Sequence, residues 1–441
     1  MSKRLILVLA LAFVVGIAFA AYAEVQNVKV SGDITVYGIY RDNYSTTNSG
    51  GGKTPTSTVG TKTSSRDSLM SIIRLRVDAD LTDNVAATVR LINERDWDVD
   101  SAATNDIDLD LAYVTLKEFL YSPMTLKVGR QDLRIGSGLV IGDGVLTDTS
   151  GEAATVLSSI LEDDLSARKA FDAIVATLDY DPLILNLAIA KLDEGINKTT
   201  DEDSDAYILD AIYKFNDKMK TVADLSYIVA HDNSTTPATP TKGLNTHIID
   251  LRLTMAEILK NLSGELEYAR EFGDYAAGRS NAGWALTAGA NYAFAGVKYS
   301  PTLGLKYDYR SGDKLQSGAT STTGKWKAWR VLYEDQVNGV IFDPNTNISI
   351  IKVSGSMKPM EDIILAADYY NYRYAQKVAV SAPNKGEKKG AGDELDLSLT
   401  YNYTEDVSFG LLGGMFWPGS DFTKGQDNTA TEILGSMKVT F

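Results

Sequence analysis

Residues 71–97 read S-I-I-R-L-R-V-D-A-D-L-T-D-N-V-A-A-T-V-R-L-I-N-E-R-D-W. On both sides of a turn at 82–84, apolar residues alternate with polar or charged ones. Because successive side chains of a strand point to opposite faces, this pattern predicts a hairpin with one apolar face and one charged face. In a secreted β-sandwich the apolar face would pack on a second sheet. In a transmembrane barrel it would face lipid, and the charged face would line a wet interior.

The two ends of the chain favour the barrel. Residues 1–23 combine the basic pair Lys3-Arg4 with an apolar run and the ending Ala21-Tyr22-Ala23, which predicts a cleaved secretory signal peptide. The last ten residues, E-I-L-G-S-M-K-V-T-F, alternate once more and end on Phe441. A final strand of this kind resembles the one that the barrel-assembly machinery of the bacterial outer membrane recognises. We therefore expect a protein of the outer membrane of a Gram-negative-type bacterium.

Composition excludes several other classes of protein. The chain has 441 residues and no cysteine, so it has neither a disulfide framework nor a lipid-anchored N-terminal cysteine. Without Lys3 and Arg4 it keeps 41 basic and 58 acidic residues, a net charge of −17, which argues against a nucleic-acid partner. After residue 23 no apolar run reaches the roughly 20 residues of a transmembrane helix.

About eighteen alternating segments follow the signal peptide, each near the length that a tilted membrane strand requires. Short connections such as 82–84 and 404–406 alternate with long ones such as 42–68, 131–170 and 311–346. This asymmetry is typical of short periplasmic turns and long extracellular loops. We therefore predict an all-β fold: a single transmembrane, antiparallel, up-and-down β-barrel over residues 24–441.

Three stretches carry a family resemblance. They are R-L-R-V-D-A-D-L-T-D-N-V and V-R-L-I-N-E-R-D-W within 74–97, L-A-Y-V-T-L-K-E-F-L at 111–120, and L-K-V-G-R-Q-D-L-R-I-G-S-G-L-V-I-G-D-G at 126–144. Together they resemble the alginate-export family of bacterial outer-membrane porins. The resemblance implies a polar lumen partly constricted by inward-folded loops, and passage of a hydrophilic solute, which in the namesake is an acidic polysaccharide. By analogy, the candidate lumen cations are Arg74, Arg76, Arg90 and Arg130.

Two interpretations of the inward charges remain open. By alternation, Asp78 and Glu94 share the charged face of the hairpin with the arginines. Paired Arg and Asp side chains form structural ladders across neighbouring strands, whereas unpaired ones form a row that binds or selects solutes. Many further acidic residues are expected to point inward, so the lumen is not evenly basic, which is unlike the namesake. A general or cation-preferring diffusion porin is therefore the alternative to glycan export.

The connection 131–170 is too long for a simple loop. Within 152–167 apolar residues fall at helical spacing. The predicted helix either docks in the barrel mouth and narrows the pore or packs outside on neighbouring loops.

No residue pattern predicts a catalytic, cofactor or resident metal site. Asp96, Asp98 and Asp100 have the spacing that opens a calcium loop, but the required glycine and glutamate are missing. That group and the acidic cluster at 201–205 are expected to be solvated loops. The two histidines, His231 and His247, border a polar loop without a positioned nucleophile. A non-conducting, surface-structural or adhesin barrel is the remaining alternative, and the expected partners are membrane lipid, lipopolysaccharide and a hydrophilic solute or glycan.

Overall fold

The computed structural model describes residues 26–43, 65–97, 107–144, 163–193, 204–232, 235–236, 239–240, 244–276, 279–313, 324–335, 338–378, 388–420, 422 and 427–441. The predicted signal peptide lies outside these residues, as do Asp98, Asp100, residues 201–203 and most of the predicted helix 152–167. The end of that helix is described, and it holds only a 3-10 turn, η2 (Asp163–Leu165).

Eighteen strands of the described residues form the wall. They are β1 (Asn27–Asp42), β2 (Arg66–Thr82), β3 (Val85–Asp96), β4 (Asp108–Leu116), β5 (Met124–Gln131), β6 (Phe171–Asp179), β7 (Leu183–Asp193), β8 (Ser204–Lys214), β9 (Thr221–Asp232), β12 (Leu244–Leu259), β13 (Leu262–Ala276), β15 (Trp284–Ala293), β16 (Thr302–Arg310), β18 (Ile348–Met360), β19 (Ile363–Val378), β20 (Lys388–Asn402), β21 (Val407–Pro418) and β22 (Ala430–Thr440). Four short strands lie outside the wall sequence: β10 (Thr235–Thr236), β11 (Thr239–Pro240), β14 (Arg279–Asn281) and β17 (Gly324–Trp326).

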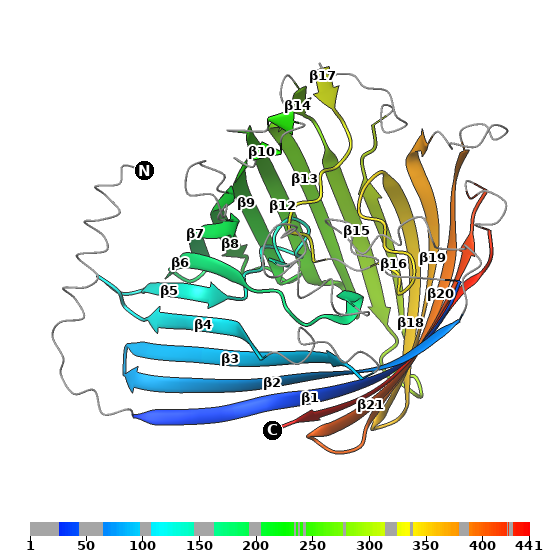
Figure 1. Cartoon of the computed structure of the whole chain (residues 1–441), viewed down its shortest axis with the longest axis horizontal. Coiled ribbons are helices and arrows are strands. Elements are labelled where there is room, and N and C mark those ends of the chain that lie inside the picture. The colour runs from blue at the N-terminus through cyan, green and yellow to red at the C-terminus, as the bar shows by residue number, and fades with distance from the viewer. Residues whose placement is uncertain are drawn as a thin grey trace.

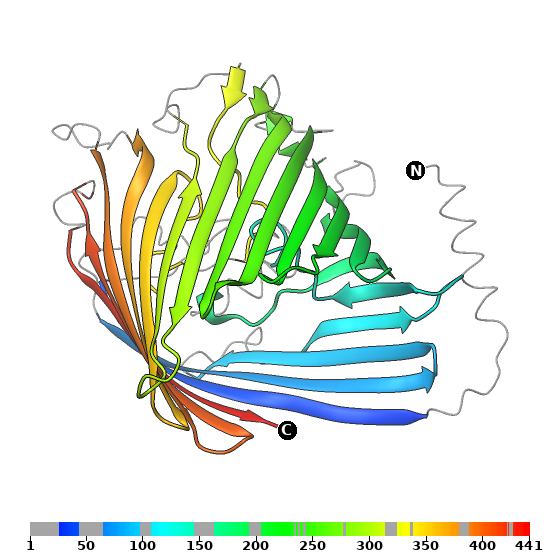
Figure 2. The same ribbon diagram turned by 180° about the vertical axis from the view of Figure 1, so that it is seen from behind.

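The wall is a closed antiparallel barrel. Each wall strand pairs with the next along the chain, and β1 pairs with β22 from Asp33 opposite Thr440 to Asp42 opposite Thr431. Figures 1 and 2 show this closure, with the first strand (blue) beside the last strands (red). Closure leaves no unpaired edge, which is the condition for a sheet in lipid. The predicted fold class and strand number are confirmed.

The outward face of the wall is apolar. On β2 the side chains of Ile73 and Leu75 are both 42% exposed. The same parity exposes Val89 and Leu91 on β3 and Leu397 on β20. Alternation therefore places the apolar row of each strand outside and the intervening residues inside.

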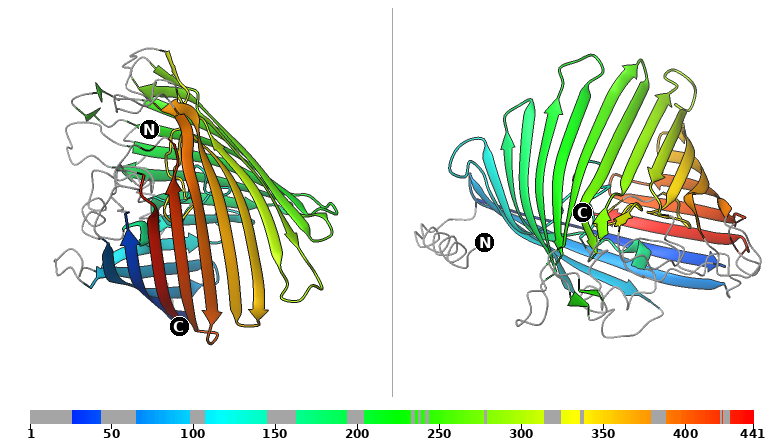
Figure 3. Two further views of the ribbon diagram at one scale, coloured as in Figure 1. Left: turned by 90° about the vertical axis from the view of Figure 1, so that its right-hand side faces the viewer. Right: turned by 90° about the horizontal axis from the view of Figure 1, so that it is seen from above.

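The two ends of the barrel differ. The turns after β2, β6, β12 and β18 are only a few residues long, and they all lie at one end, which we call the turn end. The last strand also finishes there, because the Thr440 amide donates to the Asp406 carbonyl in the turn after β20. The opposite, loop end carries the long connections, and Figure 3 shows the barrel from two further sides. In the described residues no helix is long and apolar enough to cross a membrane.

The lumen near the loop end contains three apolar clusters, which the expectation of a polar interior did not include. In the first, Leu139 and Ile141 of the β5–β6 connection pack with Tyr333 of the β16–β18 connection and with inward residues of β6–β15. In the second, Ile341 and Phe342 pack on β18–β22. In the third, Leu165 and Ala167 pack on β1, β2, β3 and β22. The described parts of the β5–β6 and β16–β18 connections therefore fold inward onto the wall.

Candidate functional site

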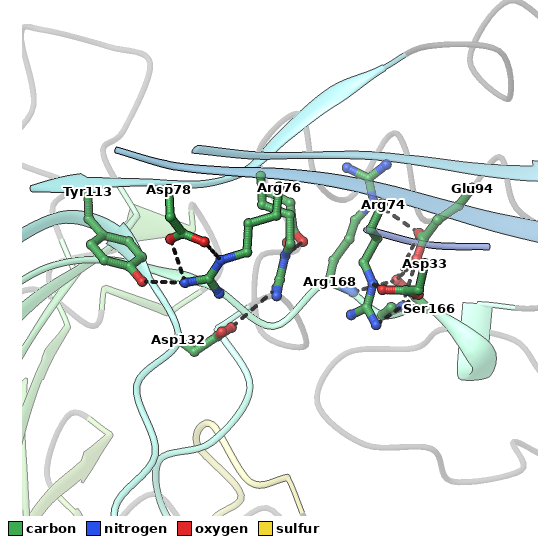
Figure 4. A network of polar contacts seen from close by, with 12 residues as sticks. Asp33, Arg74, Arg76, Asp78, Glu94, Tyr113, Asp132, Ser166 and Arg168 are labelled. Atoms are coloured by element: carbon green, nitrogen blue, oxygen red, sulfur yellow. Dashed lines mark hydrogen bonds and ion pairs between the residues drawn. The ribbon is translucent and has the colours of Figure 1, made fainter. Parts of the chain in front are cut away.

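Three arginines, Arg74 and Arg76 on β2 and Arg90 on β3, point into the lumen, but each has an acidic partner. The Arg74 Nε lies 3.0 Å from an oxygen of Asp33 on β1, and the Arg76 Nε lies 2.8 Å from Asp78 on the same strand. Arg76 also donates to the hydroxyl of Tyr113 on β4 (3.4 Å). Figure 4 shows these contacts side by side along the wall.

Arg90 belongs to the same row. Its Nε lies 2.5 Å from Asp110, and its Nη2 lies 3.6 Å from Asp132. Asp110 reaches Arg90 because the register between β3 and β4 shifts there by one residue, with Arg90 opposite Leu111 and Leu91 opposite Leu109. Two of these pairs, Arg74–Asp33 and Arg90–Asp110, join neighbouring strands as in a cross-strand ladder, and each of the three arginines has a carboxylate partner.

Glu94 is not an exposed lumen residue. Its side chain is fully buried, and it accepts hydrogen bonds from the Ser166 hydroxyl (2.9 Å) and the Ala167 amide (2.7 Å). Its third partner is Arg168, whose Nε lies 3.0 Å from the carboxylate, as Figure 4 shows. Arg168 also reaches Asp108 on β4 (2.6 Å). Glu94 thus holds the returning arm of the β5–β6 connection against the wall.

Arg130 lies on the outward face of the barrel, which corrects its assignment to the lumen. It pairs in register with Asp172, and its Nη1 lies 3.1 Å from that carboxylate. Asp172 shares its parity with Ile174, which is 49% exposed on the outer surface, whereas its neighbour Ala173 is buried inside. The analogy to the family did not take account of strand alternation. Arg130 occupies alternate positions with the outward apolar residues Leu126 and Val128, so it points to the same face as they do.

The β5–β6 connection crosses the lumen near mid-height. At the start of this connection, the Asp132 carboxylate lies 3.6 Å from the Nη2 of Arg90 on β3. Five residues later the Ser137 amide donates to Glu267 of β13 (3.3 Å). β3 and β13 are eight pairings apart in a wall of eighteen strands, so they face one another across the barrel. Arg90 and Glu267 both lie away from the strand ends.

This crossing segment has two faces. Leu133 and Ile135 are buried, at 7% and 4% exposure, in the first apolar cluster. The alternate side chains, Asp132 and Arg134, are 59% and 48% exposed. The segment therefore behaves as an extended, half-buried strand whose polar row faces the remaining lumen.

The β16–β18 connection is held by carboxylates of the wall. Glu271 of β13 accepts the Arg330 amide (3.1 Å). On the other side Glu394 of β20 accepts the amides of Ile341 (2.7 Å) and Phe342 (3.0 Å). Buried carboxylates are stable in the interior only when such donors are supplied. These acidic residues thus position a connection and are not open to a solute.

The two connections also contact each other. Ile141 and Tyr333 form an isolated parallel bridge, and the Tyr333 amide donates to the Val140 carbonyl (3.1 Å). Asp335 forms ion pairs with both arms of the β5–β6 connection, with Arg134 on the outgoing arm (2.5 Å) and Lys169 on the returning arm. The inward segments are therefore joined to one another as well as to the wall.

The wall opposite the arginine row is acidic. β8, β9, β12 and β13 carry inward carboxylates with one arginine among them, Arg252, whose Nη2 lies 3.2 Å from Glu265. Besides Glu271, these carboxylates include Asp210, Asp224, Asp250, Glu265 and Glu267. Asp210 accepts hydrogen bonds from Ser226 (2.9 Å) and Asn186 (2.8 Å). The lumen is thus unevenly charged: on one side each arginine is balanced by a carboxylate, and the opposite side carries mostly carboxylates.

Sequence reasoning missed the apolar lumen clusters and the acidic residues that hold the connections. A signal was present in adjacent apolar pairs near the loop ends of strands, where one residue must point inward. Such pairs are Ile72-Ile73, Leu91-Ile92, Ile248-Ile249 and Ile350-Ile351. In each pair one residue is buried in the lumen and the other is exposed outside.

Other residues of interest have structural partners. The His247 Nδ1 lies 2.8 Å from the Tyr227 hydroxyl, and the His231 Nδ1 lies 2.9 Å from Asn245. Asp205 pairs with Lys191 (3.2 Å), and Asp96 is buried. In the part of the chain that the structure describes, no group of three or more His, Asp or Glu side chains is arranged to hold a metal ion.

Comparison with known proteins identifies the family. The alginate-export family model matches residues 54–436, far beyond the three stretches of sequence resemblance. No curated protein matches the chain. Among solved structures, OccK3 (OpdO) of Pseudomonas aeruginosa superposes with a TM-score of 0.59 at 12% identity, over 95% of this chain and 97% of that one.

Two further structures from Pseudomonas aeruginosa have the same architecture. OpdQ gives a TM-score of 0.56 at 13% identity over 95% of this chain and 99% of that chain. The outer membrane protein OprD gives 0.55 at 11% identity over 95% of each chain. At such low identity these likenesses concern the fold alone. Because the family model covers most of the sequence, the chain belongs to the alginate-export family and is an outer-membrane β-barrel channel for solutes.

Proposed function

We propose that this channel passes small hydrophilic solutes passively and that the two inward connections narrow it near mid-height. The observation that carries this proposal is the crossing of residues 132–137 from Arg90 on β3 to Glu267 on β13. A segment held at both ends inside the lumen reduces the cross-section available to any solute. Selectivity then depends on size and on the charges beside the segment.

The wall row that a solute would meet consists of Arg74, Arg76 and Asp78. Their side chains are 23%, 35% and 34% exposed. Arg90 is 15% exposed and holds the crossing segment through Asp132, so we assign it mainly to positioning. Glu94 is fully buried and is likewise proposed to position a connection. Arg130 faces outward and is left out of the pore.

Export of an acidic polysaccharide is the second candidate, and the family match favours it. A polyanion needs a continuous track of available cations. The lumen arginines described above each contact a carboxylate, and the opposite wall is acidic. This arrangement supports small solutes over an acidic polymer.

Several further assignments belong to the same proposal. The turn end faces the periplasm, and the loop end faces the cell exterior, where the outer rim of the barrel contacts lipopolysaccharide. The terminal strand, which ends at Phe441, engages the barrel-assembly machinery after residues 1–23 have been removed. We propose no catalytic role, because both histidines are engaged in hydrogen bonds at the loop end.

The test is reconstitution of the purified chain in planar bilayers and in liposomes. We expect steady single-channel conductance, and liposome swelling with small sugars that falls steeply as solute size increases. Absence of conductance would refute the channel proposal and favour a surface-structural barrel.

Oligouronates added to the same bilayers separate the two transport candidates. Small-solute passage predicts that micromolar oligouronate leaves the current unchanged. Strong, length-dependent block by oligouronate, together with its uptake into liposomes, would instead establish polysaccharide export.

A further inference from the structure

Asp335 lies where three inward segments meet. Its carboxylate contacts the Nη1 of Arg134 (2.5 Å) through one oxygen and the ammonium of Lys169 through the other. Arg134 lies on the outgoing arm of the β5–β6 connection, and Lys169 lies on its returning arm, 35 positions later in the sequence. Asp335 itself belongs to the β16–β18 connection. One side chain thus joins three pieces of chain that are not neighbours in sequence.

The backbone around Asp335 is fixed as well. Its amide donates to the Gly138 carbonyl (2.8 Å). The carbonyl of Tyr333, two residues before Asp335, accepts hydrogen bonds from the amides of Gly142 and Asp143 (2.8 and 3.0 Å). The Asp335 side chain is 14% exposed. Partial removal from water strengthens ion pairs relative to those on an open surface. The carboxylate is therefore placed by the backbone and can fix the more mobile side chains of its two partners.

The two cations that Asp335 holds remain accessible. Arg134 is 48% exposed and Lys169 is 38% exposed, and Arg134 belongs to the polar row of the crossing segment. A guanidinium has five N–H donors and an ammonium three, so both keep donors for a passing solute. These two side chains are among the charges closest to the proposed narrowing.

We propose that Asp335 is the positioning residue of the constriction. It fixes Arg134 and Lys169 against each other and so keeps the two connections in one arrangement. Arg134 and Lys169 in turn determine the charge selectivity of the pore. This inference rests on the proposed channel function and adds the residues that set the width and the selectivity of the passage.

Two recordings in planar bilayers test it: single-channel current noise, and the reversal potential under a salt gradient. In Asp335→Asn both ion pairs are lost, while size and the backbone bonds are kept. Arg134 and Lys169 are partly exposed, so each ion pair contributes up to about fivefold to the ratio of fixed to released connections, and current fluctuations rise when both pairs are lost. The reversal potential moves toward anion preference because a negative charge has been removed.

The double variant Arg134→Gln, Lys169→Gln separates positioning from general damage. It loses the same two ion pairs, so the noise rises again. The reversal potential now moves toward cation preference because two positive charges are gone. Asp335→Glu, which restores a carboxylate, is expected to return the noise toward that of the wild type.

The matched control is Asp172→Asn. Asp172 is also a carboxylate paired with an arginine (3.1 Å), but it lies on the outward face. Neither noise nor reversal potential should change. If wild type conducts and Asp335→Asn alters neither quantity, or if both sets of variants shift the reversal potential in one direction, the inference is wrong while the channel function stands. A silent wild type would refute both.

Discussion

The Ala167 amide lies 2.7 Å from the Glu94 carboxylate, and the two residues come from separate parts of the chain. Glu94 is on wall strand β3, and Ala167 is on the returning arm of the β5–β6 connection. A residue that the hairpin pattern places on a wet lumen face is thus buried under a folded-in segment. Inward residues of the wall therefore bind the connections in addition to lining the pore.

Glu94→Ala is expected to release the returning arm. The change leaves the Ser166 hydroxyl and the Ala167 amide without their acceptor, which costs about 1–3 kcal/mol locally. Hydrogen exchange at 166–168 should therefore accelerate by about tenfold or more, while strands β2 and β3 stay protected. Unchanged exchange at these amides would contradict the assigned role of Glu94.

Glu394→Ala is expected to release the other connection. Its carboxylate accepts the amides of Ile341 and Phe342 and is fully buried. Limited proteolysis should then cut within 338–345 in the variant and not in the wild type. Glu405→Ala in an exposed turn is the control and should leave the digestion pattern unchanged. Equal resistance of both variants would show that the apolar contacts of this segment suffice.

Arg76→Ala and Arg310→Ala should differ sharply in stability. Arg76 is 35% exposed beside Asp78, so its ion pair contributes less than about 1 kcal/mol. Arg310 is 1% exposed, with its Nη2 2.9 Å from Glu334, so truncation leaves a buried carboxylate and costs about 3–5 kcal/mol. Urea unfolding in lipid vesicles measures both. Equal losses would mean that burial does not control these pairs.

The outward position of Arg130 has a direct test. Arg130→Gln should leave conductance and reversal potential unchanged, because the side chain pairs with Asp172 on the outer surface. Arg74→Gln removes a lumen charge and should move the reversal potential toward cation preference. A shift of equal size in Arg130→Gln would place that arginine in the pore after all.

Glu334 gives the β16–β18 connection a pH dependence. Burial raises the pKa of the Glu334 carboxyl to about 7, although Arg310 opposes that shift. Between its ordinary pKa and about 7 the folded state keeps a proton that the unfolded state has released. Its contribution to stability is therefore full at low pH and is lost as the pH rises through about 7.

The measurement is the free energy of unfolding of wild type relative to Glu334→Gln, from pH 5 to pH 8. The difference should fall as the pH rises, by about 1.4 kcal/mol for each unit of pKa displacement at most. The glutamine variant cannot titrate at this position and serves as the reference. A difference that is independent of pH would show that Glu334 does not titrate in this range.

The sequence by itself determined the barrel. Strict alternation in segments such as 73–81 predicts amphipathic strands, because strand side chains have a period of two. The predicted signal peptide and the terminal strand then favoured a barrel over a sandwich. Short turns such as 82–84 then fixed which strands are neighbours, and the strand count followed. The inward direction of Arg74, Arg76 and Asp78 came from the same local rule.

Only the tertiary structure decided what the inward residues contact. Glu94 and Arg168, or Asp335 and Lys169, meet through chain that is distant in sequence, and no local periodicity encodes such contacts. The apolar clusters that contain Leu139 and Phe342 likewise form only when the barrel closes around the connections. Alternation assigns a side to each residue, whereas closure of the barrel determines whether that side is open to water or covered by a folded-in segment.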